Sequence, residues 1–263
     1  MKIVAILSSF RNEGNTKQIL SLLQKHVCAS QDRHGMPCDF EIISLASANL
    51  SFCRGCRLCF DKGETSCPLH DGFFSVYQSL QNADAVILAS PVYVEDVSAA
   101  MKNFIDRMAF NCHRPAFAGK PALIVATSGM GSSNHAVRSM IFALSSWGFQ
   151  VVGKRKFRMG ALMDPAAMPP AFDDAARRLI SKLMRAISRQ EILKPSFYAL
   201  LVFKVQQKCF QNDLRYRNTY DHDYWARTGW LNPRCTYYKK HTAWPIKTAC
   251  AQLLGAVIAR ILI

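Results

Sequence analysis

The sequence predicts an α/β fold, in which a doubly wound, five-stranded parallel sheet is followed by a helical extension at the C-terminus. Over the first 190 residues, apolar runs alternate with helix-like segments, as they do when crossover helices join parallel strands. Two of the runs, residues 83–90 and 121–127, are apolar almost throughout, which is typical of strands buried on both faces. After residue 190 the alternation stops. We therefore divide the chain into domain 1–190 and extension 191–263.

The expected strands are short runs rich in Val, Ile, Leu and Phe, and helix-like segments with an apolar face lie between them. The first helix, for example, starts at Asn15 and places Ile19, Leu23 and Val27 on one side. The expected strands are 2–8, 39–45, 83–90, 121–127 and 149–153, and the expected helices start at 15 or span 72–81, 99–110, 134–147 and 173–189.

The extension combines basic and aromatic residues. It carries 11 Lys and Arg against 4 Asp and Glu, a net charge of +7, and its helix candidates are residues 195–210 and 245–263. The aromatic residues between them could stack on nucleobases, but we favour packing on the core or on a second subunit. The last helix has one apolar stripe, so we expect an amphipathic packing helix at a subunit interface, in preference to a contact with a membrane surface.

The whole chain of 263 residues is 50% hydrophobic, which excludes a disordered protein and allows a substantial core. Its net charge of +15 suits nucleic acid, anionic lipid or a phosphorylated cofactor. We find no nucleic-acid-binding module, so no specific nucleic-acid partner is expected. Ten cysteines without a signal peptide indicate reduced thiols or metal ligands and a cytoplasmic location.

Small polar residues follow the first strand, where a helix then begins. Ser8, Ser9, Arg11, Asn15 and Thr16 offer hydroxyl, guanidinium and amide donors beside a helix N-terminus, a combination that suits a phosphate monoester. On its own the stretch fits an ordinary strand–turn–helix start equally well. The loops at 90–96 and 127–133 follow other strands at the same sheet edge, where ligands of such folds bind, and this favours the phosphate interpretation.

A second cluster lies between the second strand and the next helix. Cys53, Cys56, Cys59 and Cys67 are separated by two, two and seven residues. Three interpretations stay open from the residues alone: a [4Fe–4S] cluster on four thiolates, a zinc site, or free or reversibly oxidised thiols.

Three stretches together resemble the flavodoxin-like NAD(P)H-dependent FMN reductase family. They are the loop from Ser8 to Thr16, the run Ala83–Val92 with Tyr93 and a Met-Lys-Asn-Phe-Ile-Asp-Arg segment from Met101, and Thr127-Ser128-Gly129-Met130-Gly131. The cysteines resemble the motif of iron–sulfur flavoproteins, a branch of this family. The resemblance implies an FMN site made by Ser9, Arg11, Gly14, Asn15, Thr16, Ser90, Pro91, Val92, Tyr93, Val94, Thr127, Ser128, Gly129 and Gly131.

The resemblance also implies a function. We expect an FMN-dependent oxidoreductase that takes hydride from NAD(P)H and passes electrons to a small molecule or a protein, with the flavin doing the chemistry and no catalytic side chain. The alternative is a non-catalytic electron carrier that holds FMN and a [4Fe–4S] cluster. A third hypothesis is a basic scaffold that binds nucleic acid or membrane through the extension. Family members often dimerise, so a homo-oligomer is expected.

Overall fold

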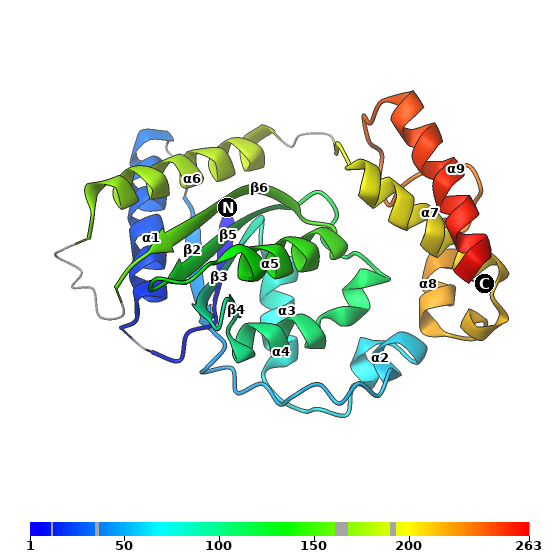
Figure 1. Ribbon diagram of the computed structural model, residues 1–263, viewed down its shortest axis with the longest axis horizontal. Helices are drawn as coiled ribbons and strands as arrows, with labels where there is room; N and C mark the ends of the chain where they lie inside the picture. The colour runs from blue at the N-terminus through cyan, green and yellow to red at the C-terminus, as the bar shows by residue number, and fades with distance from the viewer. Residues whose placement is uncertain (12, 35–36, 161–167, 190–192, 263) are drawn as a thin grey trace.

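The computed structural model describes all residues except 12, 35–36, 161–167, 190–192 and 263. Asn12 of the first loop and Ile263 of the last expected helix therefore lie outside the described residues. The centre of the molecule is a parallel sheet in the order β2-β1-β3-β5-β6 (Figure 1), in which a short strand β4 pairs antiparallel with β3. The strands are β1 (Lys2–Leu7), β2 (Asp39–Ser44), β3 (Ala85–Tyr93), β4 (Asp96–Val97), β5 (Pro121–Ser128) and β6 (Gln150–Arg158).

Helices cover both faces of the sheet, and each face has its own apolar core. Side chains of α1 and α6 pack on one face, and side chains of α3, α4 and α5 pack on the other. The predicted doubly wound α/β fold with five parallel strands and C-terminal helices is confirmed. The helices are α1 (Asn15–His34), α3 (Phe73–Asn82), α4 (Ala99–Arg107), α5 (Asn134–Ser146) and α6 (Pro170–Arg189).

Two strands run further than the sequence pattern predicts. β6 continues to Arg158, past the predicted end at residue 153, through Lys154, Arg155 and Lys156. β6 lies at the edge of the sheet, where basic side chains are tolerated and discourage pairing with another chain, so the strand lacks the apolar pattern of a central one. β3 continues through Pro91 to Tyr93, because the chain turns back after Tyr93 and the last two residues of β3 pair with β4.

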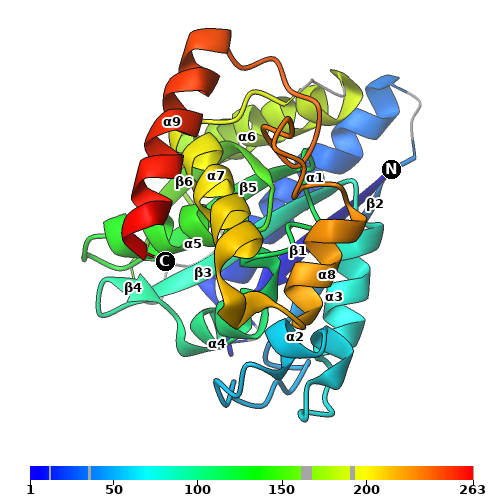
Figure 2. The ribbon, with the colours of Figure 1, turned by 90° about the vertical axis from the view of Figure 1, so that its right-hand side faces the viewer.

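The extension packs around an aromatic cluster of its own, in which Phe203, Phe210, Trp225 and Trp230 are buried. Its helices are α7 (Phe197–Asn212), α8 (Tyr220–Arg227) and α9 (Pro245–Leu262). Figure 2 shows α7 alongside α9, and α8 next to the short helix α2 (Leu58–Asp61) of the cysteine-rich loop. The polar, aromatic stretch for which no helix was expected contains α8.

The last helix does not pack as its apolar stripe suggests. The buried residues of α9 are the small ones, Ala251, Gly255 and Ala259, whereas large side chains such as Leu253 and Ile261 are exposed. By length and composition, α9 is also apolar enough to cross a membrane. The large apolar stripe is therefore exposed on the described chain, and the expected subunit interface at this helix stays a prediction.

Candidate functional site

A cavity of about 250 Å³ lies at the carboxyl edge of the sheet, between the ends of β1, β3 and β5. This is where chain order reverses across the sheet, and ligands of doubly wound folds bind at that point. The structure brings eleven of the fourteen expected residues to this cavity: Ser9, Arg11, Gly14, Asn15, Thr16, Pro91, Val92, Tyr93, Thr127, Ser128 and Gly129.

Hydrogen bonds between the loops hold the walls of this cavity together. The hydroxyl groups of Thr16 and Thr127 lie 2.7 Å apart and are buried, which ties the start of α1 to the end of β5. The Asn15 amide donates to the carbonyl oxygen of Gly160 at 2.8 Å, beyond the end of β6. The Ser9 hydroxyl accepts from the backbone amide of Arg11 at 3.1 Å. The donors beside the α1 N-terminus are therefore fixed in place before any anion binds.

The turn between β3 and β4 forms the outer rim and has an unusual backbone. Val94 and Glu95 both have positive φ angles, 49° and 65°, in a two-residue hairpin turn that normally carries Asn or Gly. The Val94 side chain is fully exposed, and Tyr93 beside it is half exposed. Backbone strain of this kind clusters at functional sites, where the surrounding structure holds a residue in a conformation that it rarely adopts.

Three expected residues do not line the cavity, and one unexpected residue does. Ser90 is fully buried; its hydroxyl donates to the Pro91 carbonyl and accepts from the Ser98 amide, so it supports the β3 loop from behind. Val94 and Gly131 lie beyond the lining. Met159, just past the end of β6, completes the wall. No pattern in the sequence pointed to Met159, because strand β6 was expected to stop six residues earlier.

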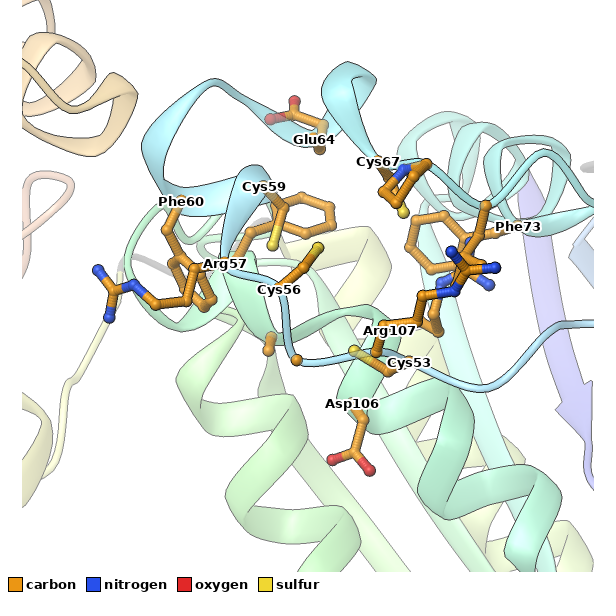
Figure 3. Close-up of a pocket in the computed structure, with 16 residues that line it drawn as sticks. Cys53, Cys56, Arg57, Cys59, Phe60, Glu64, Cys67, Phe73, Asp106 and Arg107 are labelled. Atoms are coloured by element: carbon orange, nitrogen blue, oxygen red, sulfur yellow. The ribbon is translucent and has the colours of Figure 1, made fainter.

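A second cavity, of about 320 Å³, is built by the cysteine-rich loop against α4. Cys53, Cys56, Cys59 and Cys67 all line it, and Figure 3 shows the last three facing one another across it. Phe60, Phe73 and Phe110 supply apolar walls. Among the residues that the structure describes, no three His, Cys, Asp or Glu side chains converge as ligands of a single metal ion.

The four thiols of this second cavity lie near the surface: Cys53 and Cys56 are exposed, and Cys59 and Cys67 are partly buried. Burial raises the pKa of the Cys59 thiol to about 11, a rise that nearby Arg114 opposes and the other three cysteines increase. Arg107 lines the cavity and donates two hydrogen bonds to Asp71, at 2.7 and 3.1 Å. Burial acts to raise the pKa of Asp71, but the hydrogen bonds from Arg107 and two backbone amides outweigh it and lower that pKa.

Helix α4 connects the two cavities. At its start, the Ser98 hydroxyl donates to the backbone oxygen of Ser8 at 3.0 Å, at the loop that follows β1. Five residues later, the Asn103 side chain accepts a hydrogen bond from the backbone amide of Cys53 at 3.1 Å. Five helical residues span about 8 Å along the axis. The loop of the first cavity and the first cysteine of the second are thus held by one rigid element.

The extension reaches the cysteine loop through a buried ion-pair cluster. Arg114 donates to the Asp221 carboxylate of α8, to the Cys59 carbonyl at 2.9 Å and to Glu64 at 2.8 Å. His113 Nδ1 lies 2.5 Å from the same Asp221 carboxylate. Arg114 and Asp221 are almost fully buried. The sequence did not identify these residues, because partners 107 positions apart carry no shared motif.

Comparison with known proteins identifies the chain's relatives. A family model described as NADPH-dependent FMN reductase matches residues 1–162. The chain belongs to this family. An iron–sulfur flavoprotein of Archaeoglobus fulgidus is 31% identical and covers 88% of this chain and 100% of its own length. Another, from Methanosarcina thermophila, is 29% identical over 63% of this chain and 84% of its own. The apo crystal structure of an NADH:FMN oxidoreductase (TM-score 0.50, 23% identity, 70% of this chain and 89% of that one) shares the fold.

Membership confirms the flavodoxin-like family resemblance and makes this member a flavoprotein of FMN-dependent redox chemistry. The first cavity fits the cofactor: its donors surround a helix N-terminus at the switch point, and Gly129 and Gly14 let backbone approach closely. A Cβ at Gly14 would lie 3.2 Å from the Ser9 hydroxyl oxygen, which leaves little room for a side chain there.

Proposed function

We propose that this protein transfers electrons between an FMN in the first cavity and a [4Fe–4S] cluster held by the four cysteines of the second. The observation that carries the proposal is α4, which holds the loop of one cavity and the first cysteine of the other about 8 Å apart along its axis. The acceptor is then a redox partner of the cysteine-rich face.

In this proposal, residues of the chain bind the phosphate of FMN and orient its ring. Ser9, Arg11 and Thr16 bind the phosphate beside the α1 N-terminus, where the helix dipole favours an anion. Pro91 stiffens the β3 loop, so that the backbone after it borders the flavin ring. Bound FMN supplies two-electron and one-electron redox chemistry, which the protein tunes through contacts to the ring.

The cysteine cavity supports a cluster better than either alternative. In a [4Fe–4S] cube each thiolate binds a different iron, so the four sulfurs surround a larger object than a single zinc ion. All four thiols line one cavity, which is what ligation of a cluster by four thiolates requires. Burial raises the pKa of the Cys59 thiol to about 11, which makes that thiol a poor nucleophile, whereas a bound metal deprotonates a coordinating thiol outright. Arg54 and Arg57 also line the cavity and would offset the negative charge of a thiolate-bound cluster.

A second candidate, the expected NAD(P)H-dependent reductase, is favoured by a different observation. A basic cavity of about 430 Å³ between α5 and β6 is lined by Arg138, Lys154, Arg155 and Lys156. It starts at Asn134, three residues beyond Gly131 of the flavin loop, and suits the phosphates of a nicotinamide dinucleotide. Anaerobic bleaching of the flavin by NADPH, with a higher KM after Lys156→Gln, would support this candidate. Failure of both NADH and NADPH to bleach it would reject the candidate.

The cluster is tested by serine substitution of its ligands. After anaerobic purification, the Cys56→Ser/Cys59→Ser double variant should lose the bound iron and the broad absorbance near 400 nm that thiolate-bound iron–sulfur clusters give, but keep its FMN. Cys28→Ser, an exposed cysteine on α1, is the matched control and should keep both. Equal iron in the double variant and the control would overturn the cluster. Loss of FMN as well as iron would show that the two sites are not separate.

A further inference from the structure

The outer face of α9 carries a continuous stripe of large apolar side chains. Ile246, Leu253 and Ile261 are each more than 70% exposed, and Leu254 and Val257 are 44% and 47% exposed. At 100° per residue these five positions fall within roughly one third of the helix circumference. A stripe of this kind on a surface helix marks an interaction site, since single exposed apolar residues are common but contiguous ones are not.

The stripe cannot turn inward, because the opposite face of α9 is fixed against α7. Ala251, Gly255 and Ala259 form that face and are buried. At Gly255 a Cβ would lie 2.9 Å from the Leu201 carbonyl oxygen and 2.8 Å from the Lys204 Cβ, so the two helices are in close backbone contact. Figure 1 shows α9 at the outer end of the molecule, with α7 between it and the sheet. The exposed stripe is therefore a fixed feature of the fold.

The start of α9 is basic and aromatic. Lys239 and Lys240 are exposed, and Trp244, just before the helix, is 77% exposed. This segment is anchored to the start of α7, since the Thr242 amide donates to the Leu193 carbonyl at 2.9 Å. An exposed Trp and Lys side chains at the end of an apolar face are the arrangement found where helices meet the membrane–water interface.

We propose that α9 docks this protein onto the surface of an anionic lipid bilayer, with the stripe in the interface and the helix parallel to the membrane plane. Charge complementarity decides between this occupant and a second copy of the chain. Two copies joined through α9 would bring together two extensions that each carry a net charge of +7. Anionic lipid instead attracts these cations, and its acyl chains accept the stripe. Spanning the bilayer would require α9 to leave α7, so the helix lies along the surface.

The test measures binding of the full-length protein to vesicles of phosphatidylcholine with and without phosphatidylglycerol. We expect binding that requires the anionic lipid and weakens with salt. Leu253→Gln/Val257→Gln should weaken it at least tenfold, because two apolar side chains no longer enter the interface. The matched control is Leu214→Gln, at a position that is 66% exposed, against 71% for Leu253, in the same extension but off α9. It should bind like the parent.

Tryptophan fluorescence gives a readout that needs no substitution in α9. The chain has four tryptophans; Trp147, Trp225 and Trp230 are buried, and Trp244 is exposed. Lipids brominated on the acyl chain should quench the parent, and Trp244→Phe should abolish most of that quenching. Absence of binding to anionic vesicles, or equal weakening by Leu214→Gln, would overturn the proposal. So would a dimer that Leu253→Gln/Val257→Gln dissociates, since the second copy would then be the occupant.

Discussion

Asp221 of α8 is the residue whose replacement should reveal how the extension supports the cysteine loop. Its carboxylate is 2% exposed and accepts hydrogen bonds from Arg114 and His113. Asp221→Asn keeps the shape but removes the charge, which leaves the buried Arg114 guanidinium without its main counter-ion. We expect the loop around Cys59 to loosen, because Arg114 also donates to the Cys59 carbonyl.

The expected loss of stability depends on the hydrogen-bond partners that Arg114 keeps after Asp221→Asn. Removing one partner of a buried ion pair typically costs about 3–5 kcal/mol. Arg114 retains Glu64 at 2.8 Å and the Cys59 carbonyl at 2.9 Å, and the Glu64 side chain is partly exposed. We therefore expect the lower end, about 3 kcal/mol, which lowers the melting temperature by about 6–12 °C for a chain of this size. Iron retained per chain should fall with it.

The control is Asp223→Asn on the same helix. Asp223 is 67% exposed and lies 3.6 Å from His222 Nδ1, so the loss of its charge should cost less than about 1 kcal/mol. Thermal unfolding by circular dichroism and an iron assay after anaerobic purification measure both effects. Similar melting temperatures for Asp221→Asn and Asp223→Asn would refute the reasoning, because a buried counter-ion and an exposed one would then be equivalent.

Three further predictions concern the flavin cavity and the fold. Asn15→Ala/Thr16→Ala should raise the Kd for FMN at least tenfold. Lys17→Ala is the control and should leave that Kd unchanged, because Lys17 forms an exposed ion pair with Glu13. The fluorescence of FMN released from the protein measures both Kd values. Burial, with two nearby Arg cations, lowers the pKa of His113 to about 4. In the unfolded chain His113 has its usual pKa of 6.5 and takes up a proton below that pH, whereas in the folded chain it stays neutral down to about pH 4. The free energy of unfolding should therefore fall by at most about 3 kcal/mol between pH 6.5 and 4. In denaturant titrations, His113→Gln should flatten this pH dependence. Gly148→Ala should destabilise the fold by about 2 kcal/mol or more, because φ is 96° and the new Cβ would lie 2.8 Å from a facing backbone nitrogen; an unchanged urea midpoint would contradict this.

The sheet could be predicted because its inner strands are buried on both faces. β3 and β5 are apolar along nearly their whole length, so composition alone distinguishes them from loops. The edge strand β6 could be predicted only in part, since half of its residues face solvent and hydrophobic patterning carries no signal there. The hairpin strand β4 has two residues, too few for any periodicity.

The first cavity was predictable because the three loops follow three buried strands, and topology brings such loops to one edge. Met159 was not, because its place depends on how far β6 runs. The role of Ser90 could not be predicted either, because it depends on the direction of the side chain: the hydroxyl group points toward Ser98 and not into the cavity. In the cysteine loop, the sequence identified the thiols but not Arg114 beside Cys59, which follows α4 and pairs with Asp221 of α8.

The last helix of the extension shows what hydrophobic periodicity cannot predict. The spacing in the last helix correctly predicted one apolar face, yet the structure packs the small-residue face against α7, because only small side chains allow such close backbone contact. A hydrophobicity pattern ranks faces by how apolar they are, and it cannot tell which of them a neighbouring helix will cover. The aromatic side chains before α9, in contrast, pack mainly on each other.

Anaerobic reductive titration of the freshly purified protein would show whether one chain holds both an FMN and a [4Fe–4S] cluster in electronic contact. We expect about one FMN and four iron atoms per chain, and the uptake of about three electrons, two by the flavin and one by the cluster. Absorbance should follow the flavin while electron paramagnetic resonance follows the cluster. Uptake of about two electrons by a protein that contains FMN but no iron would contradict the proposal.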